Sequence, residues 1–567
     1  MHLRAIDPCL VLGLMLCLAS APGRSEVLAV GVDADGNALI QLDSPDETRW
    51  PVDRTSRARP FVFWLNTDQD DLEDYESWPI ERPDHASEGI DSLRDLEDFA
   101  RLVVRIRDPA PDRQAQALRF SLQSHDGAVP ALNLYRGAAS DCGTGYLIDA
   151  EAARRQREAP WNVPVGQLVA GSSMDVPIEP RESAGDAARD VCFLFEGASE
   201  GLATLTVAAT RDGQPVGVES APVWLSLRHV KRLYQRVDVP WPEDRPFIFD
   251  FLTPPPAVEL EWKYDPMGFP FEAPWYETDD VIVWVYGWLK SGPGLYEQAT
   301  VRSGETIFKR LWHRGYRGRL VMFHWPTHKE DLVAGLLRSE YRGYKAGAAL
   351  ANHVAVYAGG NRRVHVTAHS LGGVPLAAAL RQGMRVDNAL FQVAAVPAEM
   401  FDPDPALRLR DMRDVATPND PDQGGYPGYL ARSETRIYSL YNPTDTTFYG
   451  WNIAQKQLKG GAALTHKYLY RPDAPDARRM VLSHLGRERQ VTDPDEARAF
   501  IARSRTHALG AEPRVRGSVH SVFDLHRAPY EFGNGHVVQW EWDPQRTTAF
   551  YNLVLDLFNT RYNSELL

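Results

Sequence analysis

The segment Val364–Gly373 constrains the fold more than any other part of this chain. It starts with a run rich in β-branched residues, which favour strands, and continues through Ser370 into two glycines. Small residues at Ala368 and Gly372 allow a strand and a helix to approach closely where they meet. The segment therefore predicts a strand, a tight turn and a helix start, with the Ser370 hydroxyl exposed at the turn.

Strand and helix patterns alternate from about residue 276 to the end of the sequence. Val281–Tyr286 is an apolar run typical of a strand buried on both faces. The helix expected from about Pro544 places apolar residues on one face, namely Phe550, Leu553, Val554, Leu557 and Phe558. Further strands are expected at Leu320–Phe323, Ala389–Val396 and Ile437–Tyr441, and helices at Ser303–His313, Tyr341–Tyr357 and Val374–Arg381. This alternation predicts an α/β fold with a mostly parallel sheet flanked by helices.

The Ala-His-Ser-Leu-Gly sequence at residues 368–372 and the pattern around it resemble the α/β-hydrolase fold, near its lipase and esterase branch. The resemblance covers residues 276–567 and implies three site residues in the order serine, acid, histidine. It makes Ser370 the nucleophile. Asp445 follows the strand that ends at Tyr441 and is the implied acid, and His536 precedes the last helix and is the implied base.

Two of these assignments have alternatives. Asp445 also fits an aspartate that only caps its turn. His520 is the main alternative base, with His526 and His507 behind it. His369 is next to Ser370, but its side chain is expected to point away from the hydroxyl, so we interpret it as structural.

The resemblance also implies an oxyanion hole made of two backbone N–H groups. One belongs to Leu371, at the start of the helix that follows the serine. The other belongs to Trp288, in the loop after the Val281–Tyr286 strand. Many relatives carry His-Gly at this place, whereas this chain carries Tyr286-Gly287.

The N-terminal part contains many short β-rich runs and no long helical pattern. Asp212-Gly213 lies between two such runs and predicts a hairpin. We therefore expect a β-rich, sandwich-like accessory domain at residues 22–235, before the hydrolase fold. Residues 236–275 are rich in proline and are expected to form a linker or strap. Insertions at about 397–434 and 449–515 are expected to form either a lid or surface decoration.

Cysteine spacing and one acidic stretch suggest two further features. Two of the four cysteines fall within the first 21 residues, which leaves Cys142 and Cys192 as a candidate disulfide, or as two buried thiols. Alternating oxygen-bearing residues could hold a structural calcium ion, although a solvated acidic loop fits them better: Asn66, Asp68, Asp70 and Asp74. His324 and His328 are four apart, but Pro326 argues against a helical metal pair.

The N-terminus resembles a secretory signal at residues 1–21. Basic residues precede an apolar run from Cys9 to Ala21, and Ala19-Ser20-Ala21 fits a cleavage site. We expect an exported protein, periplasmic, at the cell surface or extracellular, without a stable transmembrane segment once the signal is removed. The formal net charge of −14 argues against nucleic acid as a partner. The oligomeric state is left open.

These observations together predict an exported serine hydrolase that cleaves carboxylic esters, of lipid or of another acyl compound, and needs no cofactor. An acyltransferase, amidase or peptidase could use the same three residues. A third alternative is a non-catalytic surface-binding protein with a relic hydrolase fold.

Overall fold

The computed structural model describes residues 26–34, 40, 42, 53, 55–65, 96–107, 114–179, 188–239, 263–264, 269–288, 295–327, 332–396, 398–401, 430–431, 433–448, 467–469, 480–484, 487–491, 508–515, 517–540 and 542–560. Several predicted features lie outside these residues. They are the signal peptide at 1–21, the candidate calcium ligands Asn66, Asp68, Asp70 and Asp74, and most of both insertions. No described helix is long and apolar enough to cross a membrane.

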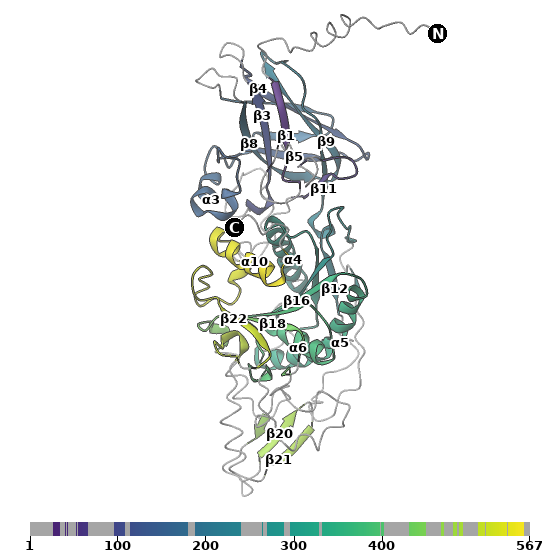
Figure 1. Cartoon of the computed structure of the whole chain (residues 1–567), viewed down its shortest axis with the longest axis vertical. Coiled ribbons are helices and arrows are strands. Elements are labelled where there is room, and N and C mark those ends of the chain that lie inside the picture. The colour runs from purple at the N-terminus through teal and green to yellow at the C-terminus, as the bar shows by residue number, and fades with distance from the viewer. Residues whose placement is uncertain are drawn as a thin grey trace, which may run out of the picture.

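An eight-stranded sheet forms the core of the C-terminal part, in the order β13-β12-β15-β14-β16-β17-β18-β22 (Figure 1). All neighbouring strands from β12 to β22 are parallel, and only β13 is antiparallel to its neighbour. The strands are β12 (Gln235–Asp238), β13 (Lys263–Tyr264), β14 (Asp280–Val285), β15 (Arg319–His324), β16 (Arg363–His369), β17 (Asn388–Gln392), β18 (Arg436–Tyr441) and β22 (Val519–Asp524). The predicted, mostly parallel sheet is confirmed.

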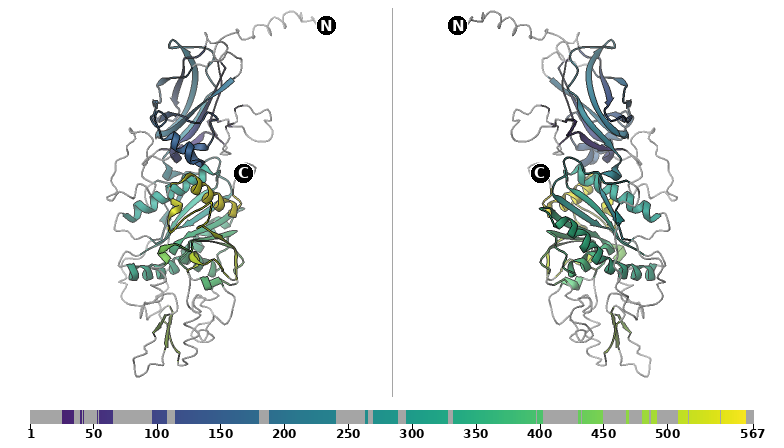
Figure 2. Two further views of the ribbon diagram at one scale, coloured as in Figure 1. Left: turned by 90° about the vertical axis from the view of Figure 1, so that its left-hand side faces the viewer. Right: turned by 90° about the vertical axis from the view of Figure 1, so that its right-hand side faces the viewer.

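Helices cover both faces of this sheet (Figures 1 and 2). Helices α4 (Leu295–His313) and α10 (Pro544–Phe558) pack together on one face, and α5 (Leu332–Ala358) and α6 (Gly373–Arg381) pack together on the other. Gly347 permits the second contact, because a Cβ there would lie 2.5 Å from the Cβ of Ala378. Helix α10 starts at Pro544 as predicted, because the Asp543 side chain accepts a hydrogen bond from the Arg546 N–H.

The N-terminal part contains two sheets with mostly antiparallel pairing. One has the order β1-β3-β8-β5-β6, from β1 (Glu26–Gly31), β3 (Ala100–Arg107), β8 (Ala188–Ser199), β5 (Ala131–Arg136) and β6 (Gly166–Val169). The other has the order β2-β11-β9-β4-β7, from β2 (Phe61–Trp64), β11 (Val223–Arg228), β9 (Gly201–Arg211), β4 (Ala117–Ser124) and β7 (Ser173–Pro177), with β10 (Gln214–Pro215) beside β9. The two sheets meet through aromatic pairs such as Phe120 and Phe193, whose ring centroids are 5.0 Å apart.

Two local predictions in this part concern a hairpin and a disulfide. Asp212 and Gly213 both have positive φ and connect β9 to β10, as a tight hairpin requires. Cys142 and Cys192 form a disulfide, with their Cα atoms 5.2 Å apart. The helices α2 (Gly145–Ile148) and α3 (Ala150–Gln156) follow Cys142 and were not expected from the sequence.

The expected linker at 236–275 contributes to the main sheet. Strand β12 begins at Gln235 and pairs in parallel with β15, and β13 lies within the same segment. The boundary expected between residues 235 and 236 therefore falls inside a strand. Strand β12 has only four residues, Gln-Arg-Val-Asp, which is too short and too polar for the apolar pattern of a buried strand. Within the second insertion, β19 (Lys467–Leu469), β20 (Met480–His484) and β21 (Arg487–Val491) form a small antiparallel sheet.

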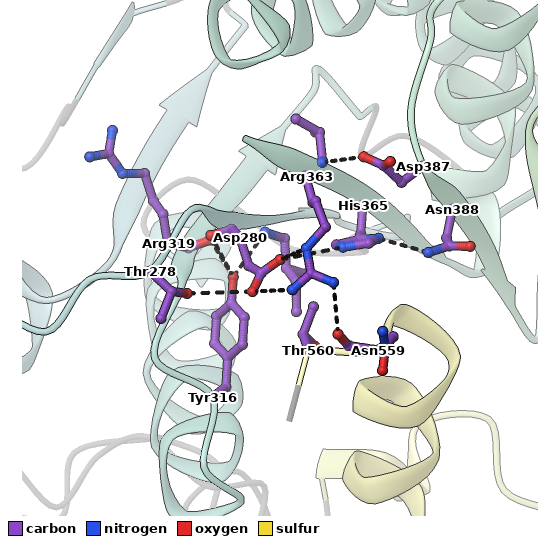
Figure 3. A network of polar contacts seen from close by, with 12 residues as sticks. Thr278, Asp280, Tyr316, Arg319, Arg363, His365, Asp387, Asn388, Asn559 and Thr560 are labelled. Carbon is purple, nitrogen blue, oxygen red and sulfur yellow. Dashed lines mark hydrogen bonds and ion pairs between the residues drawn. The ribbon is translucent and has the colours of Figure 1, made fainter. Parts of the chain in front are cut away.

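A polar network connects the strands of the main sheet at the edge where its parallel strands begin (Figure 3). Arg363, at the start of β16, donates to Asp280 of β14 at 2.9 Å and to the Asn559 carbonyl after α10 at 3.1 Å. Beside it, the Asn388 side chain of β17 lies 3.0 Å from His365 Nδ1. These contacts join three strands and the last helix. The loops that follow the parallel strands lie at the opposite edge of the sheet.

Buried histidines make the stability of this fold depend on pH. His324, His353 and His369 are almost fully buried, with 3%, 0% and 3% of their surface exposed. Burial lowers the pKa of His324 to about 3 and that of His353 to about 4, and it lowers the pKa of His369 well below its ordinary value. The rings of His324 and His353 are therefore neutral in the folded protein at pH 5.

We predict that the free energy of unfolding decreases as the pH falls below about 6.5, because histidines of the unfolded chain bind protons that the buried rings do not. Each such group contributes a slope of about 1.4 kcal/mol per pH unit between its two pKa values. Burial raises the pKa of Asp238 to about 6, which acts in the opposite sense and offsets one histidine. Urea unfolding at pH 7 and pH 5 measures the decrease in the free energy of unfolding. His324→Gln should make this decrease smaller by the contribution of one histidine. An equal pH dependence of the two proteins would contradict this account.

Candidate active site

Ser370 occupies a strained turn between β16 and α6. Its φ is 53°, a left-handed conformation that residues other than glycine seldom adopt. A 3-10 turn, Ser370–Gly372, leads directly into α6. Gly372 must lack a side chain, because a Cβ would lie 2.4 Å from the Tyr286 carbonyl oxygen and 2.8 Å from that of Val285. The close packing of this turn against the end of β14 therefore holds Ser370 at the sheet edge where the parallel strands end.

Three predicted site residues meet at this edge. His536 Nε2 lies 2.7 Å from Ser370 Oγ, and His536 Nδ1 lies 2.5 Å from Asp445 Oδ2. Ser370 follows β16, Asp445 follows β18, and His536 lies between β22 and α10. The Asp445 side chain is fully buried and 14% of the His536 side chain is exposed. The imidazole therefore lies between a hydroxyl and a carboxylate, with one ring nitrogen directed at each.

The alternatives from the sequence lie elsewhere. His520 is on β22, exposed, with its ring 5.5 Å from that of Tyr438. His526 is also exposed, and its Nδ1 lies 3.0 Å from Thr444 Oγ1. His507 is outside the described residues. Among the described histidines, His536 is the one whose ring contacts the Ser370 hydroxyl.

Both contacts that the sequence suggested for Asp445 are present. Its Oδ1 accepts a hydrogen bond from the Thr447 N–H at 2.9 Å, as a turn-capping aspartate does. Its Oδ2 contacts His536. One oxygen therefore fixes the carboxylate in its turn, and the other remains available to orient the imidazole.

The two predicted oxyanion donors lie in backbone segments beside Ser370. Leu371 is the next residue and is buried in the 3-10 turn. Gly287 precedes Trp288, and a Cβ on it would lie 3.2 Å from Ser370 Cβ and 3.0 Å from His369 Nδ1. The loop after β14 thus runs directly against the serine turn, and residues 289–294 beyond it are outside the described part.

Tyr286, the last residue before Gly287 in this loop, fills a structural position. Its ring stacks between those of His324 and Trp540, at centroid distances of 5.8 Å and 5.7 Å. Its hydroxyl lies 2.7 Å from Ser303 Oγ, and its carbonyl accepts a hydrogen bond from Trp325 Nε1 at 2.7 Å. Burial raises the pKa of Tyr286 to about 12, so the phenol stays neutral.

Residues 533–540, called the histidine loop below, are held by side chains that the sequence did not reveal as functional. Asn442 is fully buried and donates to the carbonyls of Gly533 and Gly535 at 3.0 Å and 2.9 Å. Thr444 Oγ1 donates to the Gly533 carbonyl at 2.6 Å. Gly533 has a positive φ of 54°, which lets the loop bend at this point. The turn that contains Asp445 therefore also positions the loop that contains His536.

His369 contributes to the same support. Its Nε2 lies 3.0 Å from the His536 carbonyl oxygen, which can only accept, so this nitrogen carries the proton. Burial, together with the neighbouring His536 imidazole, holds the pKa of His369 well below its ordinary value. His369 is therefore a neutral donor to the histidine loop, in agreement with its interpretation as structural.

Metal ligation receives no support in the described part of the chain. No group of three or more histidine, cysteine, aspartate or glutamate side chains there could hold an ion. His324 is buried next to Tyr286, and its sequence partner His328 lies outside the described residues.

The mostly parallel sheet and the strand–serine–helix turn are those of the α/β-hydrolase fold. No family model and no curated protein matches the sequence. Several solved structures match weakly. One of the metagenome-derived lipolytic enzymes LipS and LipT has 12% sequence identity and a TM-score of 0.24, with 50% of this chain and 94% of that chain covered.

Two further matches come from archaeal proteins. The Pyrococcus furiosus esterase Pf2001 has 10% identity and a TM-score of 0.24, with 53% of this chain and 86% of that chain covered. A Pyrococcus horikoshii acylaminoacyl peptidase has 12% identity and a TM-score of 0.24, with 51% of this chain and 39% of that chain covered. Likenesses at this level carry no conclusion about the reaction.

We predict that Asn442→Ala slows covalent labelling of Ser370 by a fluorophosphonate probe by about 100-fold, because a histidine loop displaced by an ångström no longer presents its imidazole correctly. The labelling rate of the purified protein is the measurement. Asn388→Ala is the matched control, since it removes a buried asparagine from the polar network at the other edge of the sheet. Equal slowing in both variants would show that lost stability, and not loop position, explains the effect.

Proposed function

We propose that this protein is a serine hydrolase that cleaves carboxylic esters through an acyl-enzyme. The observation that carries the proposal is the continuous chain of contacts from Ser370 Oγ through the His536 ring to the Asp445 carboxylate. A hydroxyl at its ordinary pKa is a weak nucleophile, and an adjacent imidazole oriented by a buried carboxylate is the usual means of activating it.

In the proposed mechanism, Ser370 Oγ attacks the ester carbonyl while His536 Nε2 accepts the hydroxyl proton. Asp445 keeps the proton of the resting imidazole on Nδ1, so that Nε2 is free to accept, and it stabilises the imidazolium that forms. The backbone N–H groups of Leu371 and Trp288 donate to the developing oxyanion, an interaction worth roughly 3 kcal/mol for each donor in comparable enzymes. His536 then protonates the leaving alcohol, and water enters in its place to release the acid.

The wider setting is also part of the proposal. The N-terminal apolar segment and the disulfide between Cys142 and Cys192 support export to an oxidising compartment, where disulfides persist. We propose a lipid ester or another acyl ester as substrate, with the β-rich N-terminal part acting as an accessory domain.

The test is hydrolysis of p-nitrophenyl esters of increasing acyl length by the mature protein and by Ser370→Ala. We expect the substitution to lower kcat by roughly 10⁴-fold or more, because the reaction loses its nucleophile, while thermal unfolding is unchanged. His520→Ala is the matched control and should retain activity.

Turnover that persists in Ser370→Ala would contradict the proposed mechanism. With an added alcohol or amine present, a new ester or amide in place of the free acid would identify acyl transfer instead of hydrolysis. Absence of turnover on every ester, together with absence of fluorophosphonate labelling, would favour a non-catalytic binding protein.

A further inference from the structure

Two ion pairs are buried where the N-terminal part meets helix α4. Arg310 and Lys309 of α4 have side chains with 0% exposure. Arg310 Nε contacts Glu97 Oε1 at 3.0 Å, and Lys309 Nζ contacts Asp98 Oδ1 at 2.5 Å. Both acids belong to a 3-10 turn, Leu96–Asp98, of the N-terminal part. Ion pairs of this kind are expensive to desolvate and are weak stabilisers, whereas removal of one partner leaves an uncompensated buried charge.

Arg310 extends this contact into the histidine loop. Its Nη1 donates to the Gln539 carbonyl at 2.9 Å, and the Tyr551 hydroxyl donates to the same oxygen at 3.3 Å. Gln539 lies three residues after His536, in the 3-10 turn Val538–Trp540. A line of contacts therefore runs from Glu97 through Arg310 to the backbone that carries the proposed base.

A second contact joins the same segment to the N-terminal part. Trp542 is 8% exposed and packs in an apolar cluster otherwise made by the N-terminal part: Leu96, Phe99, Tyr135, Tyr146, Leu147, Ala153 and Leu194. The Arg310 guanidinium lies 5.9 Å from the centroid of the Trp542 ring. In Figure 1, α4 and α10 lie at the end of the hydrolase part that faces α3, which agrees with these contacts.

Trp540 connects the contacts of Arg310 and Trp542 to the turn that contains Ser370. Its ring stacks on that of Tyr286, and its centroid lies 4.6 Å from that of His369. The histidine loop is therefore held on one side by Asn442 and His369, and on the other by Arg310 and the apolar cluster around Trp542. The contacts on the second side join residues that are far apart in the sequence. Glu97 and Arg310 are 213 positions apart, and Arg310 and Gln539 are 229 positions apart.

We propose that Glu97 and Arg310 are positioning residues for His536, so that the β-rich N-terminal part is required to place the base and is not only an accessory to substrate binding. This inference rests on the proposed function, because it assigns the pair to the catalytic role of His536. Glu97 fixes the Arg310 guanidinium, and Arg310 fixes the Gln539 carbonyl and with it the register of the histidine loop.

The test compares two neutral double variants of the full-length mature protein. Arg310→Met with Glu97→Gln removes the pair that contacts the histidine loop. Lys309→Met with Asp98→Asn removes the neighbouring buried pair at the same interface. We expect both to lower the melting temperature, but only the first to lower kcat by about 10- to 100-fold with KM nearly unchanged, because a displaced base weakens the chemical step more than substrate binding.

Hydrogen exchange of residues 533–540 provides a readout that does not depend on activity. We expect faster exchange of this peptide in the Arg310 double variant than in the Lys309 double variant. If the Arg310 double variant does not fold, Arg310→Lys retains a positive charge beside Glu97 with a shorter reach to Gln539, and it should produce the same effects at smaller size.

The two proposals fail in distinguishable ways. If wild-type turnover depends on Ser370 and the two double variants have the same kcat and the same exchange, the positioning inference is wrong and the proposed function stands. If wild-type turnover does not depend on Ser370, the proposed function is wrong. Faster exchange in the Arg310 double variant would then still show that the pair holds the loop, but its assignment to catalysis would be overturned.

Discussion

The hydrogen bond between His536 and Ser370 joins two loops that are 166 residues apart in the sequence, and the arrangement of the C-terminal part serves to make it. A parallel sheet brings the loops after β16, β18 and β22 to one edge, because all parallel strands end there. At the other edge, the polar network around Arg363 joins the starts of the strands to the end of α10. Ser370 itself is strained, and its strain is maintained by the contact of Gly372 with the end of β14.

The position of His536 depends on backbone carbonyls rather than on its ring alone. Asn442 binds the carbonyls of Gly533 and Gly535, His369 binds that of His536, and Arg310 binds that of Gln539. Each donor is buried, so each lost bond would leave a carbonyl without its partner in a poorly hydrated place. This is why we expect substitutions at Asn442 and Arg310 to affect the chemistry of a site that neither residue enters.

The sequence predicted those parts of the site that depend on local pattern and chain order. A β-branched run followed by a serine and glycines specifies the turn at Ser370, and the family order of serine, acid and histidine selected Asp445 and His536, which the structure brings into contact. Local chemistry also predicted the hairpin at Asp212-Gly213 and the start of α10 at Pro544.

The remaining features depend on contacts between distant residues, which no local pattern encodes. Glu97 and Arg310 each resemble an ordinary surface charge, and only the packing of the N-terminal part against α4 buries them together. The predicted boundary between accessory domain and linker cut strand β12, because four mixed residues carry no periodic signal. Asn442 precedes a proline in a turn, and its two hydrogen bonds to the histidine loop span more than 90 positions.

Whether Ser370 is an activated nucleophile is tested by reacting the mature protein with a fluorophosphonate and identifying the modified residue by peptide mass spectrometry. We expect one modified residue, Ser370, and we expect Asp445→Asn to slow the modification strongly, because the imidazole loses the partner that orients it. Modification of a different serine, or equal labelling of native and unfolded protein, would contradict the assignment of Ser370 as an activated nucleophile.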